Sequence, residues 1–119
     1  MTSDGPIYSD RAPEAVGAYP HAFAVGDLIF LSGVGPRQKG TDDIPGGPIR
    51  TPDGRQVDYD IKLQTKAVIE NIKTILTDAG SSLDKVVDCT SFLVNMERDF
   101  KGYNEIYACL LYTSPSPRD

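Results

Sequence analysis

Residues that could do chemistry gather near the N-terminus, in the stretch 16–21 and at the end of the apolar run 28–33. Tyr19 brings a phenolic hydroxyl, His21 an imidazole and Ser32 an aliphatic hydroxyl, with Gly17 and Gly33 beside them. Hydroxyls and imidazole donate and accept hydrogen bonds, and glycine lets the backbone come close to a ligand. This pattern predicts a small polar pocket.

The elements that must position this pocket begin with a β-hairpin. Residues 22–25 and 28–31 are apolar runs joined by Gly26-Asp27, a pair that suits a tight two-residue turn. The second run is continuously apolar, which predicts a strand buried on both faces. Residues 1–15 are polar and contain two prolines, so we expect a loosely held arm.

A long Gly- and Pro-rich loop follows over residues 35–59. Loops of this length inside a compact domain are usually functional or mobile. One interpretation is a solvated surface insertion. The other is that some of its basic residues face an acidic ligand, and these are Arg37, Lys39, Arg50 and Arg55.

Two amphipathic helices are predicted. Asp60 can cap a helix over residues 61–79 that stops at Gly80. Its apolar stripe is expected at Ile61, Thr65, Val68, Ile72, Ile75 and Ala79. A second helix is expected over residues 98–108, with apolar positions at Phe100, Tyr103, Ile106 and Tyr107.

Between the helices, residues 85–94 are rich in β-branched side chains and predict a strand. Cys89 in this strand is expected to be a small buried thiol, because no basic residue is close in sequence to lower its pKa. The order strand, strand, helix, strand, helix predicts an α+β domain with helices packed on one face of a sheet.

Composition excludes several classes of function. The formal net charge is −5 without a basic block, which argues against nucleic-acid binding. One histidine and two distant cysteines make neither a zinc site nor a disulfide framework, so no metal is expected. No apolar run approaches the ~20 residues of a membrane helix, and the first residues do not resemble a signal peptide. We therefore expect a cytoplasmic protein.

Five fragments carry a resemblance that runs through the chain in order, and they are Gly17-Ala18-Tyr19, residues 29–33, residues 64–80, residues 86–92 and residues 99–107. Over residues 14–108 the sequence resembles the reactive-intermediate deaminase family, also called the YjgF/UK114 family. The fragments 18–21 and 67–72 are most similar to its 2-aminomuconate deaminase branch.

The resemblance implies a chorismate-mutase-like α+β fold, with a mixed sheet and two helices on one face. It implies homotrimers with sites between subunits and cofactor-free hydrolysis of an enamine or imine acid, such as 2-aminomuconate, to an oxo acid and ammonia. Tyr19 and Ser32 match pocket residues of the family, and Asn104 matches a polar residue on the second helix. In the family an arginine on a later strand holds the substrate carboxylate, which suits a bidentate guanidinium.

Each of these residues also has a plainer interpretation. Tyr19 could be a packed aromatic, Ser32 could satisfy backbone groups at a strand end, and Asn104 could be an exposed helix position. His21, the only histidine, could lie on the surface. Our hypothesis is that His21 or a loop arginine such as Arg37 contacts the second carboxylate of a dicarboxylic substrate.

The sequence departs from the family at its C-terminus. Residues 109–119 read like the translation of a transposase-type sequencing adapter, so we expect a family domain over residues 1–108 and an adapter-derived tail over 109–119. The last two strands of the family are then missing, and Arg118 near the family position of the carboxylate-binding arginine is a coincidence. A sheet without these strands exposes an edge, so we expect this polypeptide to be poorly folded and inactive.

Two alternatives to a deaminase stay open. Some relatives carry an endoribonuclease label, which the acidic composition disfavours. A non-enzymatic ligand-binding or chaperone-like trimer could use the same fold, because fold alone does not fix function.

Overall fold

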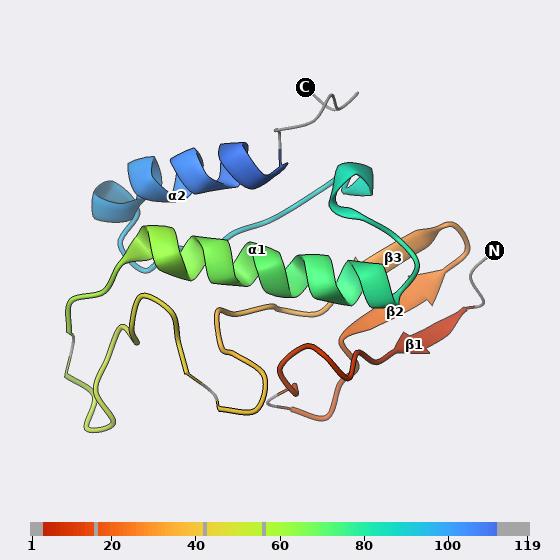
Figure 1. The fold of residues 1–119 in the computed structure, drawn as a ribbon, viewed down its shortest axis with the longest axis horizontal. Helices are drawn as coiled ribbons and strands as arrows, with labels where there is room; N and C mark the ends of the chain where they lie inside the picture. The colour runs from red at the N-terminus through yellow and green to blue at the C-terminus, as the bar shows by residue number, and fades with distance from the viewer. Residues whose placement is uncertain (1–3, 16, 42, 56, 112–119) are drawn as a thin grey trace.

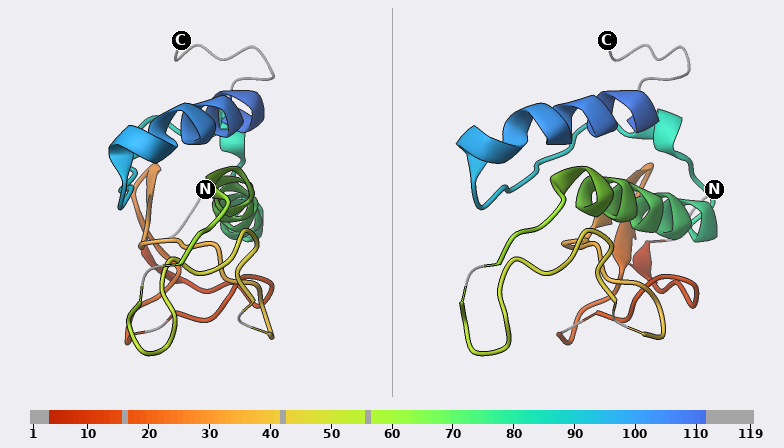
Figure 2. Two further views of the ribbon diagram at one scale, coloured as in Figure 1. Left: turned by 90° about the vertical axis from the view of Figure 1, so that its left-hand side faces the viewer. Right: turned by 60° about the vertical axis from the view of Figure 1, so that its left-hand side comes forward.

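The computed structural model describes residues 4–15, 17–41, 43–55 and 57–111. Their elements are β1 (Gly5–Ile7), β2 (Ala22–Val25), β3 (Leu28–Leu31), α1 (Ile61–Asp78), the 3-10 turn η1 (Leu83–Lys85) and α2 (Met96–Leu111). Helix α1 is central, with α2 crossing one side of it and the sheet lying along another (Figures 1 and 2). The predicted α+β class is confirmed, and the fold is chorismate-mutase-like.

The predicted hairpin is confirmed. Strands β2 and β3 pair antiparallel with Ala22 opposite Leu31 and Val25 opposite Leu28. Gly26 in the turn adopts a φ of +58°, a conformation that glycine reaches without steric cost. The prediction that residues 28–31 are buried on both faces is wrong, because Phe30 is 58% exposed. Only the face toward α1 is covered.

The N-terminal arm is held more firmly than predicted. Strand β1 pairs antiparallel with β2 and extends the sheet to the order β1-β2-β3. Ala12 is fully buried and forms the core cluster with Ala22 and Ile75. The expectation of a loose arm is therefore wrong for residues 4–15, because this segment closes one side of the core.

The first helix begins and ends where the sequence predicts, to within one residue. The carboxylate of Asp60 accepts hydrogen bonds from the N–H groups of Lys62 and Leu63, and Gly80 follows the helix with a φ of +85°. Of the predicted stripe only Thr65 and Ile75 are fully buried. The buried face is rotated from that stripe, and it comprises Gln64, Thr65, Ala67, Ile69, Asn71, Ile75 and Leu76.

The strand predicted over residues 85–94 does not form. Lys85 ends η1, and residues 86–94 follow as an extended segment outside the sheet (Figure 1). A strand needs a neighbour that accepts its backbone hydrogen bonds, and none of the three described strands pairs with this segment. Its apolar side chains are consequently uncovered, and Phe92 is 91% exposed. The prediction that Cys89 is buried is wrong for the same reason.

The second helix is longer than the predicted range 98–108. It packs on α1 rather than on the sheet, at a close approach where a Cβ on Gly102 would lie 2.9 Å from Ile61. The ion pair between Lys62 and Glu105, at 2.8 Å, links the same two helices. Residues 109–111 of the predicted tail belong to α2, and residues 112–119, with Arg118, lie outside the described residues.

Candidate active site

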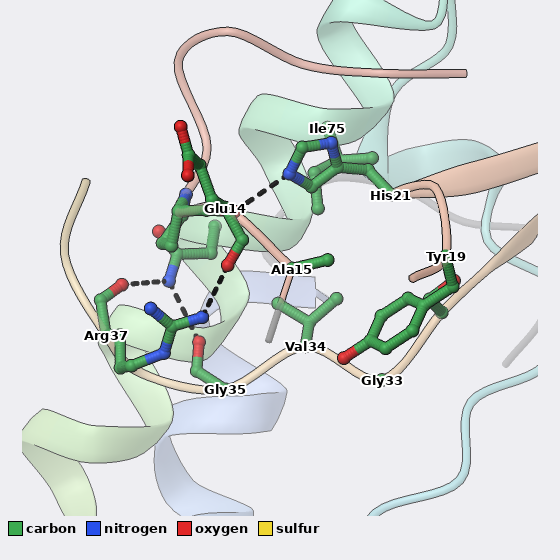
Figure 3. A pocket seen from close by; sticks show the side chains of 12 residues that line it. Glu14, Ala15, Tyr19, His21, Gly33, Val34, Gly35, Arg37 and Ile75 are labelled. Atoms are coloured by element: carbon green, nitrogen blue, oxygen red, sulfur yellow. Dashed lines mark hydrogen bonds between the residues drawn. The ribbon is translucent and has the colours of Figure 1, made fainter. Parts of the chain in front are cut away.

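A cavity of about 50 Å³ lies where the arm, the end of the hairpin and the loop after β3 meet α1. Figure 3 shows the side chains around it. It is lined by Pro13, Glu14, Ala15, Tyr19, His21, Ser32, Gly33, Val34, Gly35, Arg37, Asn71 and Ile75. The structure therefore brings together four of the five predicted site residues. Asn104 is exposed on α2 and does not line the cavity, and Val16 lies outside the described residues.

Tyr19 contributes a hydroxyl group that can form a hydrogen bond with a ligand. Its ring lies against Gly17, where a Cβ would come within 2.7 Å of the ring carbon Cε2, so glycine makes room for the aromatic side chain. The side chain is 41% exposed. Among the described residues its hydroxyl has no hydrogen-bond partner, which leaves both its proton and its lone pairs for a ligand.

Ser32 ties the end of β3 to the stretch before β2. Its hydroxyl donates to the carbonyl of Pro20 at 2.7 Å, and its backbone N–H donates to the carbonyl of His21 at 3.1 Å. Since the hydroxyl proton is engaged, a ligand would find only oxygen lone pairs on this side chain.

His21 fastens the arm to the hairpin through both ring nitrogens. The backbone N–H of Ser9 donates to Nδ1 at 3.0 Å, so this nitrogen is an acceptor. The other nitrogen, Nε2, lies 2.8 Å from the carbonyl oxygen of Pro13, so it carries the proton and donates. The two contacts select the neutral Nε2–H tautomer. They also leave neither nitrogen free for a substrate in this arrangement.

Arg37 lines the cavity, and its Nη2 donates to the carbonyl of Glu14 at 2.6 Å (Figure 3). Asn71 of α1 holds the loop that carries it. The Nδ2 of Asn71 donates to the carbonyls of Gly35 and Arg37, at 2.9 and 2.8 Å. Sequence reasoning missed Asn71. The available signal was Gln64, because two amides seven residues apart lie on one side of a helix, and Gln64 donates to the loop carbonyl of Gly47.

One carboxylate fixes the arm behind the site. Asp78, at the end of α1, accepts hydrogen bonds from the guanidinium of Arg11 and from the hydroxyl of Ser9. These contacts, that of Arg11 first, lower the pKa of Asp78 below its ordinary value. Ser9 is itself 3% exposed, so the contact joins the arm to α1 beneath the surface.

The cavity is small and forms one side of the candidate site rather than an enclosed chamber. A water molecule occupies ~30 Å³ in the liquid, so a cavity of about 50 Å³ holds one or two waters. It presents a free phenolic hydroxyl, the lone pairs of a serine hydroxyl and a guanidinium. This set suits a polar, carboxylate-bearing molecule together with an ordered water.

Solved structures of other small α+β proteins share this fold. The chain resembles Escherichia coli TdcF with bound serine, at 29% identity and a TM-score of 0.74 over 93% of this chain and 80% of that one. It also resembles YyfA of the Rid protein family from Yersinia pestis, at 30% identity and a TM-score of 0.75 over 97% of this chain and 81% of that one.

The family itself is shown by sequence. A family model described as Endoribonuclease L-PSP matches residues 9–118. A RutC family protein of Pyrococcus abyssi is 41% identical over 102 residues, which are 86% of this chain and 70% of that protein. Yeast protein HMF1 is 37% identical over 108 residues, 91% and 73% of the two chains. The chain belongs to the Endoribonuclease L-PSP family, which includes the YjgF and RutC proteins.

Proposed function

We propose that this chain represents a cofactor-free hydrolase that converts an enamine or imine acid, with 2-aminomuconate as the preferred substrate, into an oxo acid and ammonia. The gathering of Tyr19, Ser32 and Arg37 around one cavity, in a chain of this family, carries the proposal. The relative TdcF with bound serine supports it, because serine has nitrogen on the carbon beside a carboxylate, as an imine acid does.

An enamine first tautomerises to the imine, as the carbon next to the C–N carbon gains a proton and nitrogen loses one. The proposed reaction then adds water across the C=N bond, with the water oxygen bonding to the carbon and one water proton passing to nitrogen. The remaining O–H proton passes to nitrogen as the C–N bond breaks, the C=O bond forms and ammonia leaves. The free hydroxyl of Tyr19 is placed to donate toward the nitrogen, and the lone pairs of Ser32 to orient the attacking water. No step needs a metal or an electron carrier.

Carboxylate binding is proposed for Arg37. A guanidinium matches a planar carboxylate, and Arg37 lines the cavity beside the Glu14 carbonyl to which it donates. His21 is the other residue named for this role, but both of its nitrogens hold backbone groups. We therefore propose that His21 acts by holding the arm in place.

The rest of the site is proposed to come from a second subunit of a homotrimer. The cavity is too small for 2-aminomuconate, and Asn104 is exposed on α2 away from it. The outer face of the hairpin supports assembly, because its large apolar side chains are 44–58% exposed, and they are Phe23, Val25, Leu28 and Phe30. The free thiol of Cys89 agrees with the reducing cytoplasm as its proposed compartment.

The test is ammonia release from 2-aminomuconate and from a simple 2-imino acid. We expect the protein encoded at the source locus to release ammonia, and Tyr19→Phe to lower kcat/KM about 100-fold. Tyr8→Phe is the matched control, since Tyr8 is 66% exposed and does not line the cavity. No release above the blank from either substrate would overturn the proposal in favour of a ligand-binding trimer. RNA cleavage that persists in Tyr19→Phe would favour the nuclease that the family description names.

We also propose that the family domain ends at residue 108 and that residues 109–119 derive from a sequencing adapter. Sequencing the source locus tests it, since an open frame that encodes residues 109–119 in genomic DNA would contradict an adapter origin. The 119-residue chain assayed in parallel is expected to be inactive.

A further inference from the structure

The imidazole of His21 lies where the N-terminal arm, residues 4–15, meets the hairpin, and its ring lines the cavity of the candidate site (Figure 3). The backbone N–H of Ser9 donates to Nδ1 at 3.0 Å, and Nε2 lies 2.8 Å from the carbonyl oxygen of Pro13. The first contact requires a neutral imidazole, because an imidazolium has a proton on each nitrogen and no lone pair to accept with.

Protonation of His21 would turn the acceptor Nδ1 into a donor. The N–H of Ser9, a residue that is 3% exposed, would then face another N–H instead of a lone pair. A buried donor without an acceptor is unfavourable, so the ring and the Ser9 backbone are expected to move apart. The contact with Pro13 does not oppose protonation, because Nε2 donates in both states.

The segment between these two contacts leads directly into the wall of the cavity. Residues 13–15 line the cavity, and the carbonyl of Glu14 accepts the hydrogen bond from Nη2 of Arg37 at 2.6 Å. Loss of the Ser9 contact leaves this wall tied to His21 through Pro13 alone. A change of charge at the imidazole is therefore transmitted to the side of the cavity where Arg37 is held.

Other titratable and charged groups surround His21 on several elements. The ring of Tyr8 meets the imidazole edge-on, with the ring centroids 6.5 Å apart. Glu14, Tyr19 and Arg37 line the same cavity from the arm, the stretch before β2 and the loop after β3. From α1, Asp78 accepts a hydrogen bond from the hydroxyl of Ser9 at 2.5 Å and pairs with Arg11 of the arm.

The charges of these neighbours are not expected to change between pH 7.5 and pH 5.0. Hydrogen bonds from Arg11 and then Ser9 lower the pKa of Asp78, so this carboxylate stays ionised. Carboxylic acids ordinarily titrate near pH 4, phenols near pH 10 and guanidinium groups above pH 12. Imidazoles ordinarily titrate near pH 6.5, and His21 is the only histidine in the chain.

We propose that His21 makes the closure of the cavity wall sensitive to acid: its protonation breaks the contact with Ser9 and loosens residues 9–15 from the hairpin. Loosening of the arm does not depend on what the cavity binds. Its effect on hydrolysis rests on the proposed function, through the contact between Glu14 and Arg37.

NMR of the 119-residue chain at pH 7.5 and at pH 5.0 tests the loosening directly. The ¹⁵N shifts of the imidazole report its protonation, and the exchange of the Ser9 amide, relative to an unstructured chain at the same pH, reports the contact. We expect the Nε2–H tautomer at pH 7.5 and about tenfold weaker protection of Ser9 at pH 5.0, with the same midpoint as the imidazole. Amides in the middle of α1 should keep their protection.

Three results would overturn the proposal: an imidazole that stays neutral at pH 5.0, protection of Ser9 that does not follow its titration, or an equal loss of protection in α1. A spectrum without dispersed amides at pH 7.5 would also contradict the closed arm from which the proposal starts.

The variant His21→Asn separates the imidazole from other titrating groups. Its Oδ1 can accept from Ser9 in place of Nδ1 but does not titrate, so the protection of Ser9 should be equal at the two pH values. Glu14→Gln is the control, since the Glu14 side chain is 88% exposed, and it should retain the fall. A fall that persists in a folded His21→Asn chain would contradict the role of His21. If this variant does not fold, the two midpoints in the unmodified chain decide.

Ammonia release by the protein encoded at the source locus tests the effect on the site separately. Between pH 7.5 and pH 5.0, KM should rise about tenfold more in the unmodified enzyme than in His21→Asn. Equal rises would mean that the loosened arm does not affect substrate binding. No release at either pH would count against the proposed function, whereas the NMR result alone decides whether acid loosens the arm.

Discussion

We compare the hairpin region, which we define as the described residues of 5–34 with the second half of α1, with the C-terminal region, residues 86–111. The two regions differ in how well their polar and apolar groups are partnered or covered. In the hairpin region the buried hydroxyl of Ser9 and both ring nitrogens of the partly buried His21 have hydrogen-bond partners. In the C-terminal region Phe92 is 91% exposed, and Oδ1 of Asp99 meets no donor among the described residues.

The difference teaches that β-branched composition does not make a strand by itself. Residues 86–94 have as strong a composition for β structure as residues 22–31, yet only the hairpin carries its own pairing partner in adjacent sequence. A strand whose partner is distant depends on that partner being in place. Local turn chemistry therefore decides which of two similar stretches joins the sheet.

The largest expected contrast between the two regions concerns their apolar side chains. Ile75→Ala should lower the free energy of unfolding by about 2–5 kcal/mol, because it leaves a cavity beside Ala12 and Ala22. Phe92→Ala should change it by less than about 0.5 kcal/mol, since that side chain is exposed. Urea unfolding measures both. Equal losses in the free energy of unfolding would mean that Phe92 is covered in solution, which would contradict the expected difference between the two regions.

A smaller contrast is expected between two asparagines. Asn71→Ala should lower the free energy of unfolding by about 1–3 kcal/mol, because the carbonyls of Gly35 and Arg37 lose their donor. Asn104→Ala should leave it unchanged or raise it by a few tenths of a kcal/mol, since alanine favours an exposed helix position. The same unfolding assay applies. A neutral Asn71→Ala would show that water replaces the amide at no loss.

The smallest expected contrast is electrostatic. Arg11 and Ser9 lower the pKa of Asp78, and Lys62 lowers the pKa of Glu105. A folded-state pKa below its unfolded value stabilises the fold above the unfolded pKa of about 4, and this contribution is lost as pH falls through the folded-state pKa. Asp78→Asn and Glu105→Gln should therefore each flatten the dependence of stability on pH below about 4.

Asp78 should contribute more than Glu105, because it is 23% exposed and Glu105 is 48% exposed. Urea midpoints at several pH values, with and without 1 M salt, measure both. The Glu105 effect should vanish in high salt, as expected of an exposed pair. A rise in stability on acidification that depends on Asp78 would reverse the assigned sign.

The parts of the fold that sequence predicted rest on local signals. Gly26-Asp27 marks the hairpin turn, and Asp60 and Gly80 mark the ends of α1. These signals act within a few residues of the element that they define. The paired arm, the uncovered face of β3 and the exposed Cys89 depend on contacts between distant segments, so periodicity could not predict them.

The candidate site divides in the same way. Tyr19, His21 and Ser32 meet because the hairpin folds residues 19–21 back beside the end of β3. Asn71 was missed because a polar residue in a helix is expected to be exposed unless its tertiary partner is known. Asn104 was placed by family resemblance alone, and nothing in the described part of the chain brings it to Tyr19.

The two amides of α1 have a consequence for local opening of the chain. Gln64 and Asn71 lie two turns apart on one side of the helix and hold the long loop at Gly47 and at Gly35. Release of the whole loop from the helix breaks both attachments. Amide hydrogen exchange should therefore report residues 35–41 and 43–47 and the middle of α1 as one cooperative unit, opening with a shared free energy rather than fraying from the loop inward.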